Sequence, residues 1–403
     1  MTGRPGASRV LQTVAAPIRG LRRVRRPATD SAPAFDLAYI RSGPPSATPV
    51  LVIPGGPGLA SVLPYRGLRR RAAARGRDVI MVEHRGVGLS RADLAGRALP
   101  FSAMRVTAAI DDLAAVLDHE GVDTAFVVGS SYGSYLASGF GARHPDRVAG
   151  MLLDSALQST DDLPLERARV RELFWDAGTP EAAAVRWLVD GGDDQRRLLD
   201  VVRAAYELGG PRLLLPLLER RVRGHRDPVW AALEAYASRS ASILRMPGVY
   251  EFDLVGAIGF RELHYGAPPD GGPLDPALTY SPIADRFPVF AGEPFDLPAL
   301  TPRFSWPIVV LSGDRDLRTP PAIAERVADT AHDAVLARID NGHSALETHP
   351  LALLHAVDRL VAGTQHELAG ETAAMDRMPH RGLAARFPDL LMAGVRLEQA
   401  IRR

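Results

Sequence analysis

Short apolar runs that end in glycine-rich loops recur along this chain, and helical patterns separate them. The runs lie in "PVLVIPGGPG", "RDVIMVEHRGVGLS", "TAFVVG", "VAGMLLDS" and "WPIVVLSGDRD". Each has the length of a buried strand, and "RVTAAIDDLAAVLDHEGV" before the third run has apolar residues at helical spacing. Alternating strands and helices predict an α/β fold in which helices cover both faces of a mostly parallel sheet.

The middle of the chain breaks this alternation. Residues 157–303 are rich in Leu, Arg, Ala and Pro and have mainly helical patterns. We therefore predict a helical cap over 157–303, inserted into a sheet domain formed by 35–156 and 304–362. We expect residues 1–34 to form a basic, flexible N-terminal tail and residues 363–403 to form a C-terminal helical extension.

Composition restricts the partners and the compartment. The 48 basic and 47 acidic side chains nearly cancel, which argues against nucleic acid and anionic membrane surfaces as partners. No window approaches the roughly 18 unbroken apolar residues of a membrane span, and the basic N-terminal segment has no signal-peptide core. We expect a cytoplasmic protein, whose oligomeric state the sequence leaves open. Because the chain has no cysteine, thiolate metal sites and a cysteine nucleophile are excluded.

A serine stands where one apolar run changes into a helical pattern. The segment Gly129-Ser130-Ser131-Tyr132-Gly133 fits the pattern G-x-S-x-G, in which the serine occupies a tight turn between a strand and a helix. The pattern predicts Ser131 as a nucleophile. Since a serine hydroxyl is a poor nucleophile at neutral pH, an imidazole must accept its proton, and a third group must orient the imidazole.

Both partners are available downstream. "LSGDRDLRTPP" follows a buried strand and offers Asp314 and Asp316, and "ARIDNGHSALE" follows another apolar segment and offers His343. We prefer Asp316, because the pattern G-x-x-D places that carboxylate beyond the strand end, where it can reach the imidazole. Asp314 remains the alternative.

Acyl transfer also requires two backbone N–H groups that face the developing oxyanion. The residue after the nucleophile, Tyr132, would supply one of them. The loop "IPGGPG" would supply the other at Gly56, because glycine allows the backbone to approach a substrate closely. This chemistry requires no metal and no organic cofactor.

Taken together, these motifs resemble the α/β-hydrolase superfamily, and within it proline iminopeptidases and tripeptidyl-aminopeptidase-like serine peptidases. The matching segments are "PGGPG", "EHRGVGLS", "GSSYGS", "SGDRDLRTP" and "NGHS". Proline iminopeptidases usually have His where this chain has Pro54, and Trp where it has Tyr132. Both departures are more similar to the tripeptidyl branch, so the resemblance does not imply strict specificity for proline.

The resemblance extends to the predicted cap and implies an aminopeptidase. "GFRELHYG" is similar to a segment in which a glutamate binds the free α-amine of the substrate, and the matching residue is Glu262. Glu234 in "VWAALEAY" is a second candidate, although its helical context also fits a solvated face. The implied substrate is a short peptide or an aminoacyl amide. The alternatives are a carboxylesterase or lipase-like enzyme with the same triad, and a non-catalytic binding protein on the same fold.

Overall fold

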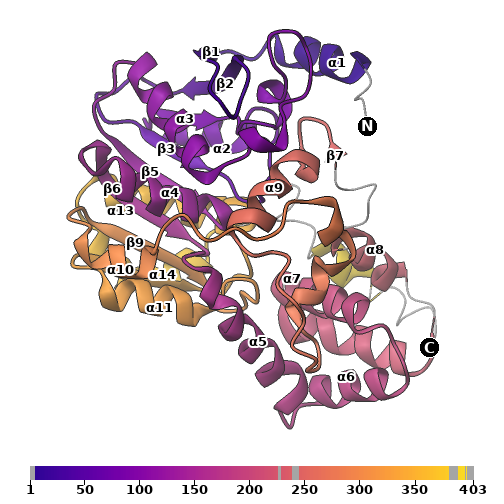
Figure 1. The fold of residues 1–403 in the computed structure, drawn as a ribbon. Coiled ribbons are helices and arrows are strands. Elements are labelled where there is room, and N and C mark those ends of the chain that lie inside the picture. Colours follow the sequence, from indigo (N-terminus) through magenta and orange to yellow (C-terminus); the bar gives the residue numbers. More distant parts are fainter. Residues whose placement is uncertain (1–4, 226–227, 238–244, 381–388, 395, 397–403) are drawn as a thin grey trace.

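A single eight-stranded sheet forms the centre of the protein, as the computed structural model shows for residues 5–225, 228–237, 245–380, 389–394 and 396 (Figure 1). The six strands from β4 to β10 in the sheet are parallel, and β1 and β2 extend it as antiparallel strands. The predicted α/β fold is therefore confirmed. The strand order is β1 (Leu21–Arg26), β2 (Phe35–Ser42), β4 (Val79–Val82), β3 (Val50–Ile53), β5 (Ala125–Ser130), β6 (Val148–Asp154), β9 (Ile308–Gly313) and β10 (Ala334–Ile339).

Helices cover both faces of the sheet, and each face has its own apolar core. One core joins the sheet to three helices through side chains such as Ile110, Phe140 and Val327, and the other joins it to three further helices through Leu68, Leu353 and Leu368. The first three helices are α3 (Val106–His119), α4 (Tyr132–Arg143) and α11 (Pro321–Thr330), and the other three are α2 (Arg66–Ala74), α13 (Pro350–Val361) and α14 (Leu368–Asp376).

The segment between β6 and β9 divides into two parts. Its first part forms a helical cap with a third apolar core, which contains Val185, Leu214 and Leu233 (Figure 1). The helices of this cap are α5 (Leu163–Arg171), α6 (Pro180–Asp190), α7 (Gln195–Val222) and α8 (Pro228–Ala237). The second part packs on the sheet domain instead, since Phe252 and Phe287 belong to the core around α3 and α4. This part contains β7 (Arg245–Met246), β8 (Tyr250–Glu251), α9 (Phe252–Glu262) and α10 (Leu297–Leu300).

The basic N-terminal segment is not a flexible tail along its whole length, and this corrects our expectation for 1–34. After α1 (Pro5–Ala15), the strand β1 pairs with β2 along its full length at the sheet edge. Its arginines bind acidic side chains of the sheet domain: Arg22 pairs with Glu120, and Arg26 lies 2.7 Å from a carboxylate oxygen of Asp112. Arginine on an edge strand also discourages pairing with a second sheet. The arginines that suggested a solvated tail therefore hold β1 in place at the edge of the sheet.

The C-terminal residues beyond β10 return to the sheet domain. The short helix α12 (Ala345–Thr348) leads into α13, and α14 packs against β10 through a core that includes Leu368 and Met375. The predicted extension is therefore helical over α14. Residues 389–394 are also helical, and Leu391 is buried in the core of the cap, whereas most of the remaining predicted terminal helix lies outside the described residues.

Candidate active site

Ser131 occupies a sharp turn between β5 and α4, as the G-x-S-x-G pattern predicts. Its backbone has φ 54° and ψ −122°, which is a costly conformation for a residue with a side chain. The turn is held in place by the neighbouring strand, because the amide of Ser131 donates a 2.9 Å hydrogen bond to the carbonyl oxygen of Asp154 at the end of β6. The fold thus places a hydroxyl at the carboxyl edge of the sheet.

The two glycines of the pattern allow the strand and the helix to approach each other. A Cβ atom on Gly129 would lie 2.2 Å from the carbonyl oxygen of Gly133, and one on Gly133 would lie 2.1 Å from the carbonyl oxygen of Ile53. Both separations are far below a van der Waals contact, and both neighbours are backbone atoms. The sequence pattern therefore reflects close packing of β5, α4 and β3 around Ser131.

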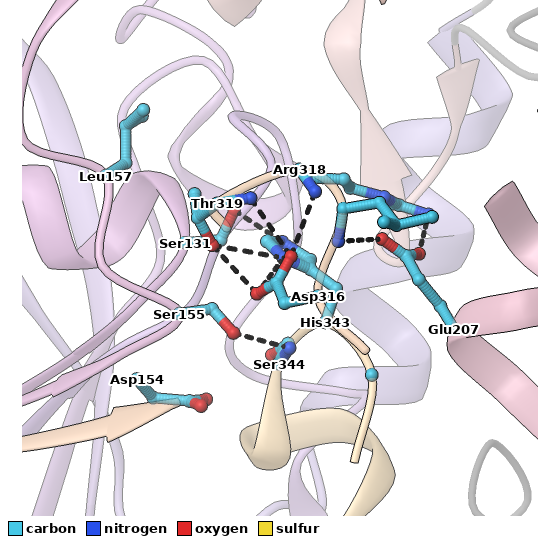
Figure 2. A network of polar contacts seen from close by, with 12 residues as sticks. Ser131, Asp154, Ser155, Leu157, Glu207, Asp316, Arg318, Thr319, His343 and Ser344 are labelled. Atoms are coloured by element: carbon cyan, nitrogen blue, oxygen red, sulfur yellow. Dashed lines mark hydrogen bonds and ion pairs between the residues drawn. The ribbon is translucent and has the colours of Figure 1, made fainter. Parts of the chain in front are cut away.

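His343 and Asp316 meet Ser131 in the arrangement of a catalytic triad (Figure 2). Nε2 of His343 lies 2.9 Å from Oγ of Ser131, and Nδ1 of His343 lies 3.0 Å from each carboxylate oxygen of Asp316. The three residues come from the turn after β5, the loop after β9 and the loop after β10. The order along the chain is therefore Ser, Asp, His, as expected from the sequence.

Asp316 is fully buried and is bound by the loop that follows it. Its Oδ1 accepts hydrogen bonds of 3.0 Å from the amides of Arg318 and Thr319, and its Oδ2 accepts one of 2.8 Å from the Thr319 hydroxyl. Burial alone would raise the pKa of Asp316, but the charge and hydrogen bond of His343 and the bonds from Thr319 outweigh it and lower that pKa to about 2. The carboxylate is thus ionised at neutral pH.

The ionised Asp316 acts in turn on the imidazole. Burial would lower the pKa of His343, but the charge of Asp316 and its hydrogen bond to Nδ1 raise that pKa above the ordinary value. Such an environment favours the protonated, positively charged form of the imidazole. The alternative acid, Asp314, lies on the surface and binds Arg338 at 2.7 Å, so the preference for Asp316 agrees with the geometry.

The loop that we expected to supply an oxyanion donor lies against the nucleophile. A Cβ atom on Gly55 would be 3.0 Å from Cβ of Ser131, and the next residue, Gly56, has φ 121°, a value that favours glycine. Tyr132 is the first residue of α4, so its amide is free of the hydrogen bonds of that helix. Its buried side chain is fixed by a 3.0 Å contact between the phenol oxygen and Nε2 of His84.

The two glutamates implied by the resemblance occupy different places. Glu262 ends α9, and its carboxylate accepts hydrogen bonds from the Val106 amide at 2.7 Å and from Arg105 at 3.1 Å, at the start of α3. Both oxygens are therefore bound by protein groups. Burial, and then the charge of Glu262, raise the pKa of the phenol of Tyr132, the residue after Ser131.

The structure does not bring Glu234 to the triad. Its carboxylate pairs with Arg197 in the first turns of α7, on the side of the cap formed by α8. Glu207 of α7, which does contact the triad loops, lies about 15 Å further along the helix at 1.5 Å per residue. Glu234 therefore belongs to the solvated helix face that the sequence offered as its alternative role.

Sequence reasoning missed a buried carboxylate that supports the triad. Asp154 ends β6, and its side chain accepts hydrogen bonds of 2.9 Å from the amides of Ala345 and Leu346, just after His343. The next residue, Ser155, accepts a 2.8 Å bond from the amide of Ser344. The signal was present in "VAGMLLDS", since an acid and a hydroxyl directly follow a buried run at the edge where the triad assembles.

The described residues contain neither a metal-binding cluster nor a membrane-spanning helix. No group of three or more His, Asp or Glu side chains in them is arranged to hold a metal ion. None of the helices in these parts of the chain has the length and apolarity to cross a membrane.

The strand order, the nucleophile turn and the Ser-Asp-His order together define an α/β-hydrolase fold. A family model described as "alpha/beta hydrolase fold" matches residues 48–188, which contain the strands β3 to β6 and the nucleophile turn.

Relatives by sequence point to one group of enzymes. A stretch of 118 residues is 31% identical to a probable proline iminopeptidase of Leptolyngbya boryana, and 115 residues are 30% identical to a proline iminopeptidase of Neisseria meningitidis serogroup A. Each match covers 28% of this chain, and 33% and 34% of the respective relative. The similarity thus spans about a third of the length of these curated proteins.

Solved structures agree on the fold. The proline iminopeptidase of Mycobacterium smegmatis is 18% identical over 87% of this chain and 100% of its own, with a TM-score of 0.50. A thermophilic esterase from Thermogutta terrifontis is 21% identical over 85% of this chain and 99% of its own, with a TM-score of 0.49. At this identity the likeness to the proline iminopeptidase concerns the fold alone.

Proposed function

We propose that the protein is a serine hydrolase in which Ser131, His343 and Asp316 form the catalytic triad. The observation that carries this proposal is the chain of contacts from Asp316 through His343 to Oγ of Ser131. Oγ attacks a substrate carbonyl while Nε2 of His343 accepts its proton, and Asp316 orients Nδ1. The amides of Tyr132 and Gly56 stabilise the oxyanion. His343 then protonates the leaving group, and water releases the acyl group from Ser131.

We infer further that the substrate is a short peptide or an aminoacyl amide with a free N-terminus. The support is the partial identity to two proline iminopeptidases and the buried carboxylate of Glu262, whose charge raises the pKa of the phenol of Tyr132, the residue after Ser131. A carboxylate there can bind an ammonium group by a charge-assisted hydrogen bond at a fixed distance from the scissile bond. In this proposal the substrate amine competes with Arg105 for Glu262.

One observation favours a carboxylesterase as the second candidate. Both carboxylate oxygens of Glu262 are bound by Arg105 and the Val106 amide, and so no oxygen is held free for an amine. An ester hydrolase needs the same triad but no amine-binding carboxylate.

A matched substrate set tests these proposals. Prolyl, alanyl and leucyl arylamides, their N-acetylated forms and a short-chain nitrophenyl ester are offered to the wild type, Ser131→Ala, Glu262→Gln and the control Glu234→Gln. The aminopeptidase proposal predicts activity on the free-amine arylamides that is lost on acetylation, in Ser131→Ala and in Glu262→Gln, but kept in Glu234→Gln. Activity confined to the ester would instead establish the esterase.

A further inference from the structure

Glu207 of α7 makes the polar contact between the cap and the triad loops, beside Leu317, whose side chain belongs to the apolar core of the cap. Oε1 of Glu207 accepts a 3.2 Å hydrogen bond from the amide of Leu317, the residue directly after Asp316 (Figure 2). Its Oε2 lies 3.2 Å from Nη2 of Arg318 in an ion pair whose carboxylate is buried and whose guanidinium is half-buried. Two carboxylates therefore hold the segment 317–319. Glu207 binds the amide of Leu317, and Asp316 accepts hydrogen bonds from the amides of Arg318 and Thr319.

The backbone of Glu207 also contacts the loop that carries His343. A Cβ atom on Gly342, the residue before His343, would lie 2.3 Å from the carbonyl oxygen of Glu207. Only glycine allows the two backbones to approach so closely. One residue of the cap thus contacts the loop of the acid through its side chain and the loop of the base through its main chain.

The charges at this contact act on the imidazole. The charge of Arg318 lowers the pKa of His343 and that of Glu207 raises it, so the two charges of the ion pair act on the imidazole in opposite directions. The other charged groups that face His343 are Asp316, Asp154 and Glu347. Glu207 comes from the cap, and so does Glu166 of α5, which interacts electrostatically with Glu207, Arg318 and Asp316.

We propose that Glu207 is a positioning residue that couples the cap to the triad: it holds the loop of Asp316 in place and neutralises Arg318 beside His343. The inference rests on the proposed function of the triad. It follows that movement of α7 away from the sheet domain would release the acid loop and leave an unbalanced cation next to the base.

The test is the variant Glu207→Gln, which keeps the size of the side chain and removes its charge. Glu219→Gln is the matched control, since Glu219 lies on the same helix with an exposed side chain and faces Arg223 at 3.7 Å. The kcat and KM for a nitrophenyl ester are measured against pH. The pKa of His343 is measured in parallel by NMR on histidine-labelled protein, with the signal assigned through His343→Gln.

For Glu207→Gln we expect a kcat about tenfold lower with KM little changed, and a pKa of His343 lowered by about half a unit to one unit. The double variant Glu207→Gln/Arg318→Gln should return this pKa towards the wild-type value, and the control should behave as wild type. A folded Glu207→Gln protein whose pKa of His343 is unchanged or raised would overturn the proposal.

Failure of the variant to fold and failure of the proposed function lead to different conclusions. If Glu207→Gln does not fold, the single variant Arg318→Gln decides, because removing only the cation should raise the pKa of His343, and an unchanged or lowered value overturns the proposal. If the wild type cleaves no ester or amide, or Ser131→Ala keeps the activity, the proposed function fails. The NMR titration still tests Glu207 in that case, because it requires no turnover.

Discussion

The carboxylate of Asp154 accepts a 2.7 Å hydrogen bond from the hydroxyl of Ser130, the residue immediately before Ser131. The same carboxylate accepts two amide hydrogen bonds from Ala345 and Leu346, just after His343. A single buried side chain therefore connects the strand of the proposed nucleophile with the loop of the proposed base.

Asp154→Asn is expected to weaken this connection. The amide NH₂ group cannot accept a hydrogen bond, so at least one of the three donors loses its acceptor, at a cost of about 1–3 kcal/mol in the free energy of unfolding. We also expect a lower kcat, because the loop of His343 is less firmly held. Chemical denaturation and steady-state kinetics measure the two effects, and wild-type values for both would contradict this role of Asp154.

The assignment of the triad acid can be tested within one loop. Asp316→Asn should lower kcat by about 10⁴-fold, because an amide neither fixes the tautomer of His343 nor stabilises its cation. Asp314→Asn is the matched control: Asp314 is exposed and pairs with Arg338 on the surface, so we expect nearly wild-type kinetics. A large loss in Asp314→Asn with activity retained in Asp316→Asn would reverse the assignment.

The pH dependence of kcat/KM should report the pKa of His343. His343 must be neutral to accept the proton of Ser131, so activity should fall as pH decreases through that pKa. Because Asp316 outweighs burial and raises the pKa, we expect the midpoint of this fall above the ordinary value of about 6.5. In Asp316→Asn the midpoint should move to lower pH. A midpoint below 6 in the wild type would contradict this electrostatic account.

The glycine after the nucleophile is expected to be irreplaceable. In Gly133→Ala the new Cβ atom would lie 2.1 Å from a backbone oxygen of β3, so we expect a loss of about 4 kcal/mol or more, or failure to fold. Gly178→Ala is the control, since no heavy atom lies within 4 Å of the added Cβ atom there. Thermal unfolding of both variants measures the difference, and equal melting temperatures would show that the packing of α4 on β3 is looser than described.

Much of the candidate site could be predicted from the sequence because its signals are local. Ser131, Asp316 and His343 each follow an apolar run that forms a parallel strand, and the carboxyl ends of such strands meet at one edge of the sheet. The strands β3 to β6 and β9 were recognisable for the same reason, since buried parallel strands form continuous apolar runs.

Other features depend on contacts between distant residues and have no local signal. The strand β1 has four arginines among six residues, and only the acids that meet it, such as Glu120 and Asp112, make it an edge strand. Likewise, Glu207 contacts Leu317 across 110 positions of the chain. A helical pattern predicts that Glu207 lies on a helix, but not which loop the cap places against it.

The most direct test of the central claim is whether Ser131 becomes covalently modified. The protein is treated with a fluorophosphonate, which reacts with activated serine hydroxyls, and is analysed by intact mass and peptide mapping. The account predicts one adduct, located on Ser131, that is absent in Ser131→Ala and in His343→Ala and still forms in Ser130→Ala. No adduct in the wild type, or an adduct that persists in Ser131→Ala, would contradict the claim that Ser131 is the nucleophile.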